Sequence, residues 1–138
     1  MIILDTNVLS ELLRREPEKM VIQWVDAQPV GELVTTAITV QESFYGAELV
    51  DQPRRIALVN ALERLFDELT VVPYDETCAR YTAVVLARAR LGGRPMHQAD
   101  AQIAGIALRH GATLATGNTR DFALTGVTLH DPWSAGDG

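Results

Sequence analysis

Several features are scarce or absent in this 138-residue chain, and each absence narrows the class of protein. Cys78 is the single cysteine, so no disulfide can form within the chain, and we expect a small buried thiol in a reducing compartment, the cytoplasm. No run approaches the roughly 18 apolar residues that a membrane span requires. The N-terminus also lacks the basic region and cleavage site of a signal peptide. These absences predict a protein that does not associate with membranes.

Positive charge is also scarce. The 12 Lys and Arg residues are outnumbered by 18 Asp and Glu, which leaves a net charge of −6, and Lys19 is the only lysine. This balance argues against a protein that coats nucleic acid with a basic face. It does not exclude a substrate that carries phosphate, because divalent cations bound to acidic side chains would reverse the local charge.

The composition that remains is that of a globular domain, with 47% hydrophobic and 22% charged residues. Strand-like and helical segments alternate, which predicts a single α/β domain over residues 1–138 with helices on both faces of a small, mostly parallel sheet. The expected strands cover residues 2–5, 33–36, 70–73, 113–116 and, at an edge, 127–130. The expected helices cover residues 8–14, 18–27, 40–50, 53–69, 76–91 and 98–110.

Four acidic residues are placed where they are expected to meet. Asp5, Glu42 and Asp121 each follow a predicted strand, and Asp100 lies in the first turn of a predicted helix. Residues beyond the carboxyl ends of parallel strands gather at one edge of the sheet, where ligands bind. Asp100 can join them if its helix points its N-terminus at the same edge.

Helix capping is an alternative explanation for three of these acids. Glu42 follows Thr39 by three residues, as in a capping box, and Asp121 stands in the same relation to Asn118, a good N-cap. Asp100 in a first turn is favoured by the helix dipole. Asp5, at the end of a buried strand, offers no comparable explanation.

Taken together, the four acids predict a metal site. Their mutual repulsion in a cleft would cost several kcal/mol unless cations neutralised it. A carboxylate cluster without cysteine or histidine suits the hard cations Mg²⁺ and Mn²⁺. Such cations bind phosphate oxygens and activate water, so metal-assisted hydrolysis of a phosphodiester is the expected reaction.

The sequence resembles the PIN-domain family, and in particular VapC-type toxin ribonucleases of bacterial type II toxin–antitoxin pairs. The resemblance rests on the order and spacing of four stretches, MIILDTNVLSELL, TTAITVQESFYGAEL, ADAQIAGIALRHGATLATGNTRDF and the closing DPW. It implies a three-layer α/β/α fold and a metal-dependent endoribonuclease. It also implies a homodimer and a cognate VapB-like antitoxin that covers the active site.

The resemblance implies roles for individual residues. Asp5, Glu42 and Asp100 match the first three acids of the family. Some members place the fourth acid where this chain has Asn118 and others at the position of Asp121; because Asn118 is a weak neutral ligand, we prefer Asp121 as the catalytic and metal-binding residue. The residue before Asn118 is a glycine, whereas many members have a basic residue there.

Polar neighbours of these acids have two possible roles. Thr6, Asn7 and Thr116, like Asn118, are candidates for ordering metal-bound water, although Asn7 is equally suited to be an N-cap. The histidines share no ligand-like spacing, and we expect none of them to be catalytic. Arg88, Arg90 and Arg94 surround a Gly-Gly loop, where they either bind RNA or form a solvated helix end.

Two other classes of function compete with the nuclease. One is a non-catalytic module that keeps the fold and serves as the antitoxin's partner or co-repressor, although such a module has no need of a repulsive acidic cluster. The other is an aspartyl-phosphate enzyme, which needs a second aspartate two residues after the first and a late lysine. Asn7 and Lys19 do not meet these needs.

Overall fold

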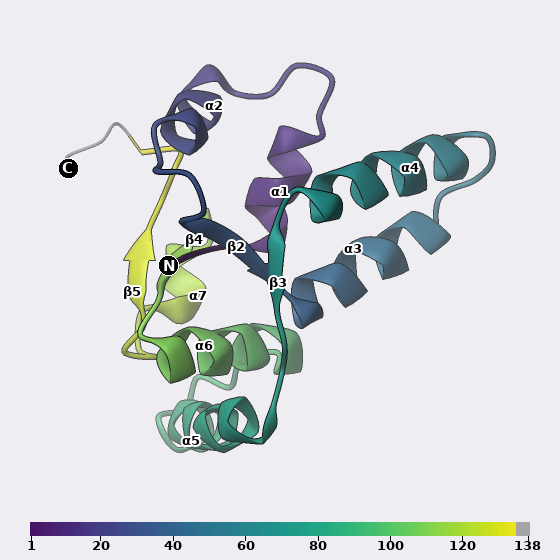
Figure 1. Ribbon diagram of the computed structural model, residues 1–138. Coiled ribbons are helices and arrows are strands. Elements are labelled where there is room, and N and C mark those ends of the chain that lie inside the picture. Colours follow the sequence, from purple (N-terminus) through teal and green to yellow (C-terminus); the bar gives the residue numbers. More distant parts are fainter. Residues whose placement is uncertain (135–138) are drawn as a thin grey trace.

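The computed structural model describes residues 1–134, which form a five-stranded, all-parallel sheet with helices on both faces (Figure 1). This confirms the predicted α/β/α fold. The strands are β1 (Ile2–Leu4), β2 (Leu33–Thr36), β3 (Thr70–Val72), β4 (Thr113–Ala115) and β5 (Thr128–His130), in the order β3-β2-β1-β4-β5. The helices are α1 (Thr6–Leu12), α2 (Lys19–Asp26), α3 (Ala37–Glu48), α4 (Arg54–Asp67), α5 (Glu76–Leu91), α6 (Gln98–His110) and α7 (Thr119–Phe122). A single domain over all of residues 1–138 stays a prediction.

Alternation along the short strands separates two hydrophobic cores. Successive side chains of a strand point to opposite faces, so Ile3 packs in one core and Leu4 in the other. The Ile3 core also contains buried residues of α5, α6 and α7, among them the predicted buried thiol of Cys78. The Leu4 core receives α1 and α2 and the C-terminal part of α4. The central strand is therefore covered on both sides.

Close contact between α5 and α6 depends on a glycine. A Cβ atom at Gly105 of α6 would lie 2.8 Å from the Cys78 carbonyl oxygen and would also collide with the Thr82 hydroxyl, both on α5. Glycine is the residue that allows two helices to approach this closely. The packing fixes α6, and with it the acid in its first turn.

The start of the third helix was displaced by local capping, and one helix was not expected. The third helix begins at Ala37 rather than residue 40, because Thr36 ends β2 and directly caps α3 by accepting a hydrogen bond from the Thr39 amide (3.0 Å). The unexpected α7 has four residues, which is too short for an apolar repeat to be visible. Within residues 1–134, no helix combines the length and apolar character that crossing a bilayer demands.

Candidate active site

The site lies at the carboxyl ends of the parallel strands, at the point where the strand order reverses. From β1 the chain continues to β2 and β3 on one side, whereas β4 and β5 lie on the other. Ligands of open α/β sheets bind at such a point. Asp5 directly follows β1 and Thr116 directly follows β4, and the Thr116 hydroxyl donates a 2.7 Å hydrogen bond to Asp5 Oδ2.

Asp5 is held in a network of donors. It is 4% exposed and accepts hydrogen bonds from the Thr6 amide (2.8 Å), the Thr116 hydroxyl and the Asn7 side-chain amide (3.2 Å). Burial is the largest influence on this carboxyl and raises its pKa, while the hydrogen bonds to Thr116 and Thr6 act in the opposite direction. An ionised Asp5 is therefore costly unless positive charge is nearby.

Two expectations for this segment were wrong. Asp5 does have a capping role, because it is the N-cap of α1, which begins one residue later. Asn7 is consequently inside the helix and is not its cap. Its side chain instead links α1 to the loop after β4, donating to Thr116 Oγ1 (3.1 Å) and accepting from the Gly117 amide (3.0 Å).

Glu42 reaches the site from α3 and is bonded to α1. Its Oε1 accepts a 2.7 Å hydrogen bond from the Thr6 hydroxyl, whose own amide donates to Asp5. Thr6 thus joins two of the predicted acids. The capping-box explanation for Glu42 is wrong, because α3 is capped by Thr36, six residues earlier in the chain.

Asp100 lies in the first turn of α6, as predicted, with Ala104 and Ala107 buried on the sheet behind it. The pKa of this half-buried carboxyl is raised to about 6, first by burial and then by repulsion from Asp5 and Glu42, with a smaller contribution from Asp121. Asp5, Glu42 and Asp121 therefore each lie close enough to Asp100 to repel its negative charge. This shared repulsion is what a cation would relieve.

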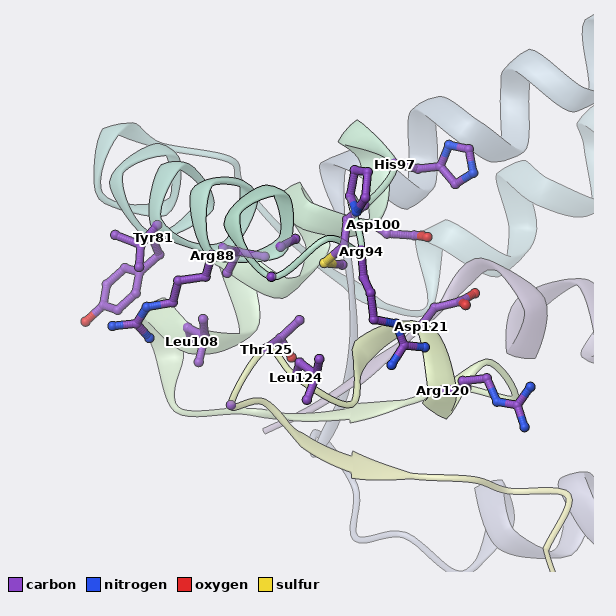
Figure 2. Close-up of a pocket in the computed structure, with 17 residues that line it drawn as sticks. Tyr81, Arg88, Arg94, His97, Asp100, Leu108, Arg120, Asp121, Leu124 and Thr125 are labelled. Atoms are coloured by element: carbon purple, nitrogen blue, oxygen red, sulfur yellow. The ribbon is translucent and has the colours of Figure 1, made fainter.

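The last two candidates lie on α7, which starts beyond β4. Asn118 is the N-cap residue of α7, but its side chain makes no capping bond; its amide donates to Thr116 Oγ1 (3.0 Å). Asp121 is exposed, and Figure 2 shows its side chain in the same part of the close-up as those of Arg94 and Arg120, with which it forms no ion pair within residues 1–134. The choice between Asn118 and Asp121 for the fourth position stays a prediction.

Two cavities meet at Asp100. The first, which we call the acidic cavity, has a volume of about 510 Å³ and is lined by Asp5, Glu42 and Asp100, together with Thr6, Asn7, Ser10, Glu11, Arg14, Asn118 and Trp133. The second, which we call the arginine cavity, has about 660 Å³ and contains Arg88, Arg94, Arg120, Asp100 and Asp121 (Figure 2). The predicted acids are thus divided, with Asp100 in both cavities.

The chemical types of the oxygen atoms in the acidic cavity suit a hard divalent cation. They are carboxylate, hydroxyl and amide oxygens, which Mg²⁺ and Mn²⁺ prefer. Within residues 1–134, however, no three Asp, Glu, His or Cys side chains are gathered closely enough to hold one ion. The physical reason is that carboxylates without a counter-charge repel, and Asp5 and Glu42 satisfy their oxygens with Thr116 and Thr6 instead.

The structure adds residues that sequence reasoning did not assign to the site. Trp133 lies against Gly117, where a Cβ atom would come within 3.0 Å of Cζ3 of the indole ring. A side chain at position 117 would therefore press on the indole ring, and Trp133 packs against this glycine. Glu11 and Arg14, an ion pair at 3.0 Å, form the wall beside it. In the sequence, the closing DPW motif, which contains Trp133, was the feature that could have indicated this side of the cavity.

Comparisons with known proteins agree with this geometry. The profile of the PIN domain matches residues 2–127. The VapC ribonuclease Y4jK of Sinorhizobium fredii is 39% identical over 137 residues, which cover 96% of this chain and 98% of that protein. Toxin FitB of Neisseria gonorrhoeae is 35% identical over 137 residues, covering 96% and 99% of the two chains.

Solved structures give the same result. The crystal structure of FitAcB from Neisseria gonorrhoeae superposes with a TM-score of 0.88 at 34% identity, covering 96% of this chain and 99% of the other. The DNA-bound VapBC structure from Salmonella typhimurium superposes with a TM-score of 0.82 at 26% identity, covering 95% and 97%. Profile, sequence and fold coincide over nearly the whole chain, which therefore belongs to the PIN-domain family.

Proposed function

We propose that this chain is the toxin of a type II toxin–antitoxin pair and acts as a divalent-metal-dependent endoribonuclease, with Mg²⁺ as its ion and Mn²⁺ as a substitute. The observation that carries the proposal is the set of mutually repelling acids at the switch point of the sheet. The relatives named as a VapC ribonuclease and as a toxin support it.

The four acids around the point where the two cavities meet each have a proposed task. Asp5 and Asp100 hold the ion, and Glu42 and Asp121 complete its surroundings. A divalent cation in this position supplies positive charge for the phosphate oxygens and favours the ionisation of water. Thr116 and Asn7 keep the Asp5 carboxylate oriented through their hydrogen bonds, and their donors lower its pKa against the effect of burial.

The proposal includes partners and a compartment. We expect a VapB-like antitoxin that covers the active site and a homodimer of this chain, acting in the cytoplasm. The α3–α4 hairpin, which projects from the sheet in Figure 1, exposes Tyr45, Leu49 and Ile56 and offers apolar surface for such contacts.

The first experiment is cleavage of total cellular RNA by the purified chain, with Mg²⁺ or Mn²⁺ and with excess chelator. Asp100→Asn and Asp5→Asn are expected to fold normally and to lose at least about 100-fold in rate, because each removes a charge that holds the ion. Asp67→Asn, an exposed acid on α4, is the matched control and is expected to cut like the wild type.

Calorimetric titration with Mn²⁺ separates the nuclease from a non-catalytic binding module. The wild type is expected to bind Mn²⁺ and the Asp5→Asn variant to bind it more weakly. Wild-type cleavage rates in both acidic-cavity variants would contradict the proposal. An inert wild type that also fails to bind Mn²⁺ would favour the binding module.

A further inference from the structure

The arginine cavity is larger than the acidic cavity and continues it. It lies between α5, the loop that leads into α6, and the segment that follows α7. Figure 2 shows Arg94 and Arg120 near Asp121 at the acidic end, and Arg88 beside Tyr81 at the far end. A ligand that reaches Asp100 in one cavity can therefore extend into the other.

Charge in this cavity favours an anion. Within residues 1–134, Arg88, Arg94 and Arg120 form no ion pair with a carboxylate. Three unpaired guanidinium groups on one cavity of a chain with net charge −6 are complementary to phosphate. A solvated helix end explains Arg88 alone, but it does not explain Arg120, which comes from a different part of the chain.

The surface between the two charged ends is apolar. Val85, Leu108 and Leu124 line the cavity, and Leu124 is 76% exposed. Figure 2 shows Leu108 and Leu124 between Arg88 and Arg120. Tyr81 is 42% exposed beside Arg88, so part of this aromatic side chain is open to solvent. Small inorganic anions gain no binding energy from contact with apolar side chains, whereas nucleobases stack on aromatic and apolar groups.

We propose that the arginine cavity binds the unpaired RNA strand on one side of the bond to be cut. Arg94 and Arg120 contact the phosphates nearest the acidic cavity, and Arg88 contacts a phosphate at the far end. A base between them lies on Leu108 and Leu124, and the next base stacks on Tyr81. This inference rests on the proposed ribonuclease function and assigns part of its substrate binding to α5, α6 and the segment from α7 to Thr125.

The test measures binding of a fluorescein-labelled unpaired oligoribonucleotide of about ten nucleotides by anisotropy across a salt series. All proteins carry Asp5→Asn so that the probe is not cut. Arg88→Ala and Arg94→Ala are each expected to weaken binding about five-fold. Each should also reduce the slope of log K against log salt by about 0.7, because one phosphate is no longer neutralised. Tyr81→Ala is expected to weaken binding about five-fold or more, and Tyr81→Phe less than about two-fold.

The matched control is Arg90→Ala, an exposed arginine on the same helix that does not line the cavity. It is expected to keep both the affinity and the salt slope. Thermal unfolding establishes that each variant is folded. Equal salt slopes for Arg88→Ala and Arg90→Ala would overturn the inference, as would a Tyr81→Ala variant that binds like Tyr81→Phe.

Light scattering and cleavage assays distinguish the remaining outcomes. A change from dimer to monomer in Tyr81→Ala would overturn the inference, because the cavity would then be a contact between two copies. Arginine variants, with Asp5 restored, that bind and cut like an active wild type would overturn it and leave the proposed function standing. A wild type that neither cuts nor binds RNA would overturn both.

Discussion

The two cavities that meet at Asp100 differ in how they are built. The acidic cavity is the smaller, and its floor is a connected set of hydrogen bonds among Asp5, Thr6, Asn7 and Thr116. The arginine cavity is larger, and its cations make no ion pair within residues 1–134. Cavity size therefore does not indicate where the chemistry is. Fixed polar groups mark the proposed reaction centre, and free cations beside apolar surface mark the proposed binding surface.

The largest expected effect comes from displacing one wall of the arginine cavity. Gly105→Ala forces α5 away from α6, because the new Cβ atom meets the Cys78 carbonyl oxygen at 2.8 Å and collides with Thr82. We expect the free energy of unfolding to fall by about 2–3 kcal/mol in urea titrations. Gly46→Ala on α3 meets nothing within 4 Å and is expected to leave stability unchanged or raise it by about 0.5–1 kcal/mol. Equal stability of the two variants would contradict the tight α5–α6 contact.

The next effect concerns the floor of the acidic cavity and leaves the arginine cavity intact. Thr116→Val removes the hydroxyl that donates to Asp5 and accepts from the Asn118 amide, and this hydroxyl is fully buried. We expect a loss of about 2 kcal/mol in the free energy of unfolding, since a buried charged acceptor loses its donor. The pKa of Asp5 should rise further, which moves the acid limb of the cleavage pH profile to higher pH. Thr116→Ser should retain both properties, and a Thr116→Ser variant as impaired as Thr116→Val would contradict this role.

The smallest effect tests the charge repulsion at Asp100, where the two cavities meet, without reference to activity. Its pKa rises from 3.8 to about 6 on folding, so between these values the folded state holds a proton that the unfolded state has lost. Stability in chelator should therefore fall as pH rises from about 4 to 6. Asp100→Asn should lack this loss, so its free energy of unfolding should rise relative to that of the wild type by about 1.5 kcal/mol over that range. This figure is half of what the pKa shift alone gives, because the side chain is partly exposed. A pH-independent difference between the two proteins would exclude the repulsion.

Much of the fold could be predicted, because strands and helices differ in the period of their apolar residues. Helices α5 and α6 and strand β2 have the predicted limits, since the glycines after residue 91 and the glycine at 111 mark two ends plainly. The start of α3 could not be predicted, because Thr36 is both the last residue of a strand and a cap. Helix α7 is too short to have a period.

The acids of the site were visible in the sequence, but their surroundings were not. Asp5 follows an apolar run, which made it conspicuous, yet its bond to Thr116 links positions 111 residues apart. The same holds for Arg120, which lines one cavity together with Arg88 and Arg94 although α7 is distant from both of them in the sequence. The contact between Trp133 and Gly117 is a third case, since neither residue indicates the other.

The strand order has a consequence for the making of this protein. The central strand β1 precedes β2, β3 and six helices in the chain, whereas β4, which completes its other side, begins at Thr113. Asp5 is therefore synthesised well before Thr116, whose hydroxyl donates a hydrogen bond to it. A chain that ends before β4 lacks the hydroxyl that holds Asp5, so the proposed reaction centre can be assembled only after β4 has been synthesised.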